Sequence, residues 1–179
     1  MNFIIRSAQL ADAPRLSAFA ALTFGETFAG DNTPEDMARY LGETFAAERQ
    51  AAEIADPTGA VLLAVAADRD GRVADEFLAY AHLVAFPAPA TVGGDRPIEL
   101  RRFYVARAWQ GRGVAGALMD AVLDAARERT AEVLWLGVWE RNARALAFYR
   151  RHGFRRVGEH VFVLGDDRQT DWILARDIA

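Results

Sequence analysis

The spacing of hydrophobic residues changes several times along the chain, and each change marks an expected strand or helix. Two nearly continuous apolar runs, AVLLAVAA at 60–67 and VLWLGVW at 133–139, have the length and composition of buried strands. Apolar residues at helical spacing after Asp12-Ala13-Pro14 predict a helix that ends near Phe28. The same criteria predict strands at Phe3–Arg6, Glu76–Phe86, Ile98–Val105, Arg155–Leu164 and Asp171–Ala175, and helices from Thr33 to near Asp56, from Gln110–Ala115 onward, and over Asn142–His152.

Polar residues and glycines mark where these elements begin and end. Asp12 and Thr33 are candidate helix N-caps, and Asp36 is a capping-box-like partner of Thr33. Gly153 has the position of a residue just past a helix C-terminus. Irregular connections are expected at 68–71, 87–97 and 165–169, the first and last of them as hairpin loops.

The expected elements follow one another in the order β-α-α-β-β-β-α-β-α-β-β. This order predicts one mixed α/β domain over residues 1–179. A chain of 179 residues with 52% hydrophobic residues can bury one good core, and it is short for two independent domains.

Composition narrows the classes of function. The sequence has no cysteine, which excludes disulfides, thiolate catalysis and cysteine-based zinc sites. The net charge of −4 argues against a nucleic-acid partner and favours cationic substrates. Three histidines lie too far apart in the sequence to suggest a metal cluster, so no metal is expected. Neither a membrane-spanning run nor a signal peptide is recognisable, and the absence of cysteine permits the cytoplasmic location that we expect.

The stretch from Glu99 to Leu123 carries the strongest chemical signal. A strand runs into Gln110-Gly111-Arg112-Gly113-Val114-Ala115, and a helix follows directly. The N–H groups at a helix N-terminus have no partners within the helix, and glycines let the backbone approach a ligand closely. We therefore expect this turn to bind a pyrophosphate. A P-loop nucleotide hydrolase is not indicated, because the turn lacks the Lys-Ser/Thr pair of such sites.

Two motifs together resemble the GCN5-related N-acetyltransferase (GNAT) superfamily. The family's Gln/Arg-x-x-Gly-x-Gly/Ala signature is matched at 110–115, and a second motif is matched by Asn142 through Tyr149 with Gly153-Phe154 following. The resemblance implies a central, mixed, mostly antiparallel sheet of about seven strands flanked by four helices. TFGETF at 23–28 and GEHVF at 158–162, with Gly165-Asp166-Asp167, further resemble the PaiA-type bacterial polyamine acetyltransferases.

The resemblance also implies an acetyl-CoA site. The strand end, Phe103, Tyr104 and Val105, would diverge from the next strand, and the backbone groups of Phe103 and Val105 would bind the pantetheine arm and the acetyl carbonyl. Asn142 would contact the pantetheine or cap its own helix. The pyrophosphate would lie against the turn, whose expected binding residues are Gln110, Gly111, Arg112, Gly113, Val114, Ala115 and Gly116.

Two residues are candidates for proton transfer. Tyr149 has the position of the family's general acid, which protonates the departing CoA sulfur, although a tyrosine on an amphipathic helix is also an ordinary core residue. Glu99 precedes Phe103 by four residues, which we expect to place both on one face of the strand. It is then either the general base or a carboxylate paired with Arg101, Arg102 or another cation.

The acceptor is expected to enter from the side opposite CoA, between the first helices and the last hairpin. Phe24, Phe28 and Trp139 would offer aromatic faces to a cation there, and Glu26 a negative charge, unless they are ordinary core or surface residues. Further acidic candidates are Asp31, Glu159, Asp166 and Asp167.

The sequence thus predicts direct acetyl transfer from acetyl-CoA to a primary amine, with small amines such as polyamines as the first candidates. Transfer to a peptide amino terminus or a protein lysine is one alternative, and an acetyl-CoA-binding sensor without catalysis is another. The sequence does not determine the oligomeric state; a homodimer, which is common in the superfamily, is one option.

Overall fold

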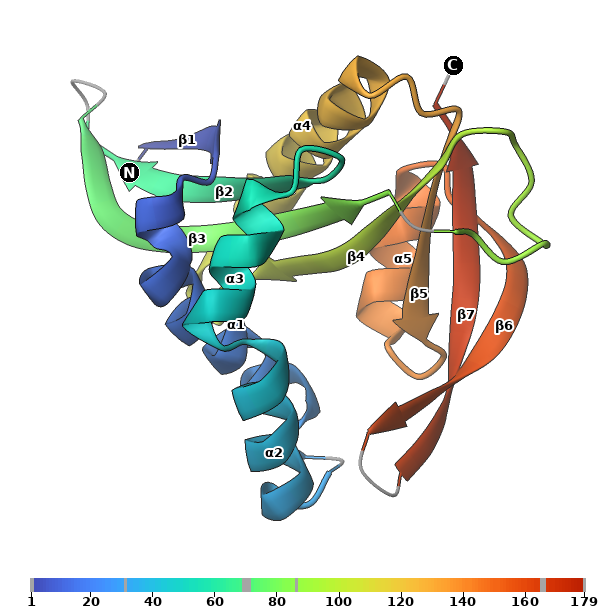
Figure 1. Cartoon of the computed structure of the whole chain (residues 1–179), viewed down its shortest axis with the longest axis horizontal. Helices are drawn as coiled ribbons and strands as arrows, with labels where there is room; N and C mark the ends of the chain where they lie inside the picture. Colours follow the sequence, from blue (N-terminus) through green and yellow to red (C-terminus); the bar gives the residue numbers. More distant parts are fainter. Residues whose placement is uncertain (1, 31, 69–71, 86, 165–166, 179) are drawn as a thin grey trace.

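A single seven-stranded sheet runs through the molecule in the order β1-β2-β3-β4-β5-β7-β6 (Figure 1). We describe it from a computed structural model, over residues 2–30, 32–68, 72–85, 87–164 and 167–178. All neighbouring strands pair antiparallel except β4 and β5, which are parallel. The strands are β1 (Asn2–Ser7), β2 (Ala60–Ala67), β3 (Val73–Val84), β4 (Pro97–Val105), β5 (Val133–Trp139), β6 (Arg155–Leu164) and β7 (Asp167–Asp177).

Helices cover both faces of the sheet (Figure 1). One face packs against α4 and α5 around Leu118, Met119 and Leu134. The other packs against the first three helices around Leu16, Phe24 and Leu63. None of the described helices is both long and apolar enough to cross a membrane. The helices are α1 (Ala13–Phe28), α2 (Pro34–Thr44), α3 (Ala47–Ala55), α4 (Val114–Glu128) and α5 (Ala143–Arg151), with short 3-10 turns η1 (Leu10–Asp12) and η2 (Arg107–Trp109).

The predicted helix from Thr33 to Asp56 is wrong in one respect, because it is two helices. Thr33 caps α2 as expected, accepting a hydrogen bond from the Asp36 N–H at 3.2 Å. The chain leaves helical geometry at Phe45 and becomes extended at Ala46, with ψ of 142°. This break buries the Phe45 ring, which is 2% exposed, in the core with Phe24. The described part of the chain therefore has five α-helices in place of the expected four.

Other predicted boundaries shift by a few residues. The last hairpin loop is shorter than 165–169, because β7 already pairs with β6 from Asp167 onward. The β3 strand begins at Val73 and ends at Val84, earlier at both ends than expected. Asp12 stands at the α1 N-cap position without capping it; its carboxylate instead accepts from both terminal nitrogens of Arg6, at 2.6 and 2.8 Å.

The parallel strands β4 and β5 separate after only three paired positions. Pro97, Ile98 and Glu99 pair with Val133, Leu134 and Trp135, and no pairing continues between the described residues beyond them. The two strands point in clearly different directions in Figure 1. We call this unpaired region, Arg101–Val105 of β4 and Leu136–Trp139 of β5, the splay.

Candidate active site

The splay leaves backbone groups of β4 without a strand partner. The Ala106 N–H donates to the Leu78 carbonyl on β3 at 2.8 Å, and Tyr104 is paired with Tyr80 on the same side. Because strand residues alternate, the N–H and C=O groups of Phe103 and Val105 point the other way, into the splay. This is the arrangement expected for the two residues, whereas the backbone of Tyr104 faces β3 and is already paired.

The glycine turn before α4 is open on its outer side. Gly111 and Gly113 have φ of +77° and +85°, a region that glycine adopts without strain. Apart from each glycine's chain neighbours and the nearby backbone of α4 itself, no described atom lies within 4 Å of a Cβ built at Gly111, Gly113 or Gly116, and no side chain caps the helix. The first-turn N–H groups thus remain available to an anion. Residues 111–116 therefore fit a pyrophosphate.

Gln110 links three parts of the site. Its side-chain nitrogen donates to the Val105 carbonyl at 3.0 Å, and its oxygen accepts from the Arg144 guanidinium on α5. The end of β4, the turn and the start of α5 are thereby held together at the mouth of the splay.

Helix α5 carries Tyr149 to the splay. The helix ends in a Schellman motif, in which Gly153, at φ of +81°, donates to the Arg150 carbonyl and Phe154 donates to that of Tyr149. The Tyr149 ring packs edge-on against Phe103 of β4, with centroids 6.3 Å apart. Burial raises the pKa of its phenol above the ordinary value. At the other end, Asn142 caps α5 by accepting from the Ala145 N–H, so the cap is the role that the structure shows for it.

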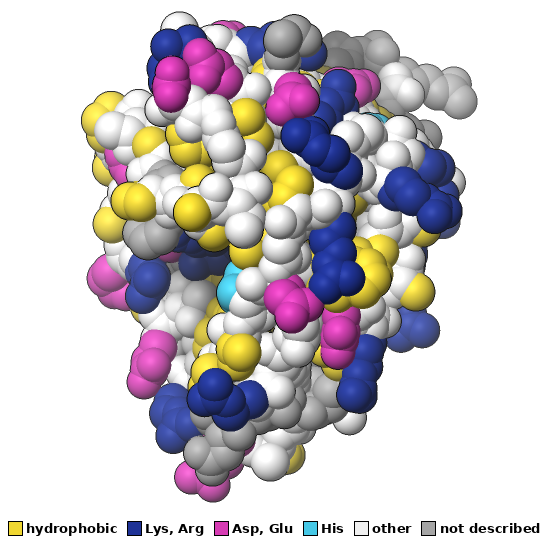
Figure 2. All heavy atoms as spheres, turned by 90° about the vertical axis from the view of Figure 1, so that its right-hand side faces the viewer, with side chains coloured by type: hydrophobic (Ala, Val, Ile, Leu, Met, Phe, Trp, Pro, Cys, Tyr) yellow, Lys and Arg dark blue, Asp and Glu magenta, His cyan; other side chains and the backbone are white. Residues whose placement is uncertain are grey.

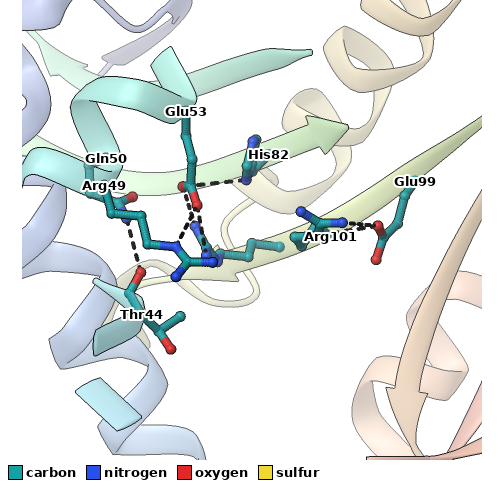
Figure 3. Close-up of polar contacts among 8 residues, drawn as sticks. Thr44, Arg49, Gln50, Glu53, His82, Glu99 and Arg101 are labelled. Atoms are coloured by element: carbon teal, nitrogen blue, oxygen red, sulfur yellow. Dashed lines mark hydrogen bonds and ion pairs between the residues drawn. The ribbon is translucent and has the colours of Figure 1, made fainter. Parts of the chain in front are cut away.

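The expectation that Glu99 shares a face with Phe103 is wrong. The register of β3 and β4 shifts at Arg101, where β4 has one extra residue, a β-bulge. Leu100 and Phe103 consequently both pack toward α4, and Glu99 lies on the opposite face. Its carboxylate accepts from Arg101 at 2.7 Å (Figure 3). The predicted ion pair is present, and a role as base stays a prediction.

The structure brings only some of the four main residues predicted to bind the acceptor amine into contact. Phe28 of α1 and Trp139 of β5 are in contact, with centroids 6.3 Å apart. Phe24 is a core residue, 4% exposed and stacked on Tyr40. Glu26 is exposed and lies two residues from both phenylalanines, on another side of α1.

The structure does not bring the remaining acidic candidates to the Phe28–Trp139 contact in its described residues. Glu159 is exposed and pairs with Arg156 at 2.6 Å. Figure 2 shows the end of the molecule that carries β6 and β7, where arginine and acidic side chains lie side by side. Asp31 and Asp166 lie outside the described residues, as does the side chain of Asp167.

Sequence reasoning missed Asp171, a half-buried carboxylate on β7. One signal could have revealed it. Residues 169, 171, 173 and 175 share a strand face, and Ile173 and Ala175 belong to the core. A carboxylate in line with core residues is unusual and often functional. Among the described residues, no group of three or more His, Asp or Glu side chains is arranged to hold a metal.

Comparison with known proteins gives a consistent family. The model of the acetyltransferase (GNAT) family matches residues 26–154. An uncharacterized N-acetyltransferase from Lactobacillus delbrueckii subsp. lactis is 39% identical over 165 residues, which cover 92% of this chain and 91% of that protein.

Two solved structures are similar over nearly their whole length. The PaiA N-acetyltransferase from Thermoplasma acidophilum, in complex with coenzyme A, has a TM-score of 0.75 at 19% identity, with 99% of each chain covered. At that identity the likeness shows the fold alone. The ribosomal-protein-alanine N-acetyltransferase from Brucella melitensis has a TM-score of 0.65 at 26% identity, with 97% of this chain and 99% of that chain covered. The chain belongs to the acetyltransferase (GNAT) family and is an acyltransferase.

Proposed function

We propose that this protein transfers an acetyl group from acetyl-CoA directly to a primary amine, with polyamines as the first compounds to test. The observation that carries the proposal is the splay. It directs the backbone groups of Phe103 and Val105 into a space bordered by the open glycine turn and by Tyr149. The splay and Tyr149 suit the thioester end of acetyl-CoA, and the glycine turn suits its pyrophosphate.

The chemistry needs three contributions from the chain. The acceptor ammonium must lose a proton, the tetrahedral oxyanion must be stabilised, and the leaving thiolate must gain a proton. The backbone N–H groups of the splay suit the oxyanion, the phenol of Tyr149 suits the thiolate, and Glu99 is the candidate base. Direct transfer is favoured because no cysteine is present to carry an acyl group.

The test is release of CoA from acetyl-CoA in the presence of an amine panel that includes spermidine. We expect turnover with at least one aliphatic amine. Tight acetyl-CoA binding without turnover of any amine would contradict the proposed amine acetylation.

Acetylation of a peptide amino terminus is the second candidate. The solved ribosomal-protein-alanine N-acetyltransferase, similar over nearly the whole chain, is the observation that favours it. A peptide beginning with alanine belongs in the same panel for this reason. Preference for that peptide over every small amine would replace the polyamine proposal.

A further inference from the structure

Asp171 lies in the first half of β7, next to the edge strand β6, on the sheet face opposite α4 and α5. It lies directly across from Trp139 of β5 and from His160 of β6, so the three side chains share one face. Gly137 is on that face too. A Cβ built at Gly137 would be 3.0 Å from His160 Cε1 and 3.5 Å from Asp171 Oδ2. The absence of a side chain at Gly137 is what leaves room for this pair.

The Asp171 carboxylate is poorly satisfied. Its Oδ1 atom is buried and has no hydrogen-bond partner among the described residues. Burial raises the pKa of the carboxyl group, and the nearby His160 opposes the shift. A buried polar atom without a partner destabilises a fold, and native proteins tend to retain one where a ligand or a reaction uses it.

The surroundings of Asp171 suit an alkylammonium group. On one side, the Trp139 ring contacts Phe28, and Tyr40 of α2 packs against Phe162 of β6 at 6.2 Å. On the other side, the loop before β4 covers the sheet, with Val92 buried against Trp135 and Ile173. Aromatic faces and a carboxylate together favour an organic cation over a neutral molecule.

The position of Asp171 relative to the splay indicates which cation it would hold. The reacting carbon belongs between β4 and β5, and Asp171 is on β7, one strand beyond β5. Adjacent strands are about 4.8 Å apart. A carboxylate more than one strand spacing away from the reacting carbon is too distant to form an ion pair with the nitrogen that attacks it. It can reach a second nitrogen separated from the first by a short methylene chain.

We propose that Asp171 binds the second, non-reacting ammonium group of a diamine or polyamine acceptor. The inference rests on the proposed amine acetylation and names the acceptor class within it. Asp171 is then a specificity-determining residue, which distinguishes a diamine from a monoamine of equal length.

The test compares 1,4-diaminobutane with butylamine in the wild type and in Asp171→Asn. A charge-assisted hydrogen bond contributes about 1.5–3 kcal/mol, so we expect the wild type to prefer the diamine about 10- to 100-fold in kcat/KM. Asp171→Asn should lose this preference through a higher KM for the diamine, with acetyl-CoA affinity unchanged. Its melting temperature should be equal or higher, because the substitution removes a poorly satisfied carboxylate.

Asp177→Asn is the matched control. It makes the same change on the same strand, at an exposed residue paired with Arg155, and should keep the diamine preference. The inference is wrong if Asp171→Asn retains the preference, if Asp177→Asn loses it equally, or if Asp171→Asn merely unfolds at lower temperature with both amines affected alike. A wild type that uses both amines equally also overturns it, while the proposed acetylation stands. Absence of turnover with every amine instead overturns the proposed function itself.

Discussion

At the scale of single residues, Tyr149 combines position with a suitable protonation state. Its ring contacts Phe103, whose backbone points into the splay. Because burial raises the pKa of the phenol above its ordinary value near 10, the protonated form persists at every pH where an amine would be assayed. Tyr149 can therefore act as a proton donor, and its titration should not produce an alkaline limb below about pH 10.

Tyr149→Phe should lower kcat about 100-fold, the lower range for loss of a general acid, and leave acetyl-CoA affinity unchanged. Steady-state kinetics and calorimetric titration measure the two quantities. Tyr80→Phe is the matched control, since Tyr80 is also buried and its hydroxyl has no hydrogen-bond partner among the described residues. Unchanged turnover in Tyr149→Phe would remove this residue from the mechanism.

Glu99→Gln tests the candidate base. If Glu99 accepts the acceptor's proton, kcat/KM should fall about 100-fold, and the loss should become smaller as the pH rises and more of the amine is already deprotonated. If the carboxylate serves only its ion pair with Arg101, the rate and its pH profile should stay as in the wild type. The pH profile thus separates the two roles that the sequence left open.

At the scale of elements, α3 is attached to the sheet by a buried ion pair. Glu53 of α3 accepts two hydrogen bonds from Arg102 of β4, at 2.5 and 3.1 Å, and His82 of β3 lies 3.6 Å from the same carboxylate (Figure 3). Burial lowers the pKa of His82 to about 4, so at neutral pH it adds no second positive charge beside Arg102. The pair therefore links α3 directly to β4.

Arg102→Gln should lower the free energy of unfolding by about 3–5 kcal/mol, because it leaves the Glu53 carboxylate, which is only 14% exposed, without its main partner. Arg49 also pairs with Glu53, but its own side chain is 57% exposed. Arg49→Gln should therefore lower the free energy of unfolding by at most about 1 kcal/mol. Urea denaturation measures both. Equal losses would mean that burial does not decide the strength of these pairs.

At the scale of the whole molecule, the acetyl-CoA site joins parts that are distant in sequence. The end of β4, the turn before α4 and the start of α5 meet around Gln110. A ligand that contacts all three segments holds them together, and its binding stabilises the folded state by mass action. A homodimer stays a prediction at this scale.

Acetyl-CoA at 100 times its dissociation constant should stabilise the fold by about 2.7 kcal/mol and raise the melting temperature by about 5–10 °C. Hydrogen exchange should slow at residues 103–105 and 111–116. Saturating pantetheine, which lacks the pyrophosphate, should protect the first segment without the second. Protection elsewhere, with none at the turn, would contradict the assigned site.

Much of the fold was predictable because local patterns decide it. The strands at 60–67, 133–139 and 155–164 have the predicted bounds, since apolar runs or alternation define them. The break at Phe45 was not predictable, because residues 33–56 keep helical spacing and the break serves packing against Phe24. The bulge at Arg101 was equally hidden, because a bulge depends on the partner strand and carries no required residue type of its own.

For the site, local sequence patterns predict the parts that offer backbone groups to a ligand. The glycines at 111 and 113, the helix start after them and the Gly153 terminus of α5 all depend on local conformational preferences, which neighbouring residues encode. Which side chains lie together depends instead on strand pairing and packing. Glu99 lies on the other face of β4 from Phe103, and Phe24 is a core residue. Asp171 of β7 lies beside His160 of β6 and beside Gly137 and Trp139 of β5. Strand pairing brings together residues far apart in sequence, and no local pattern specifies that register.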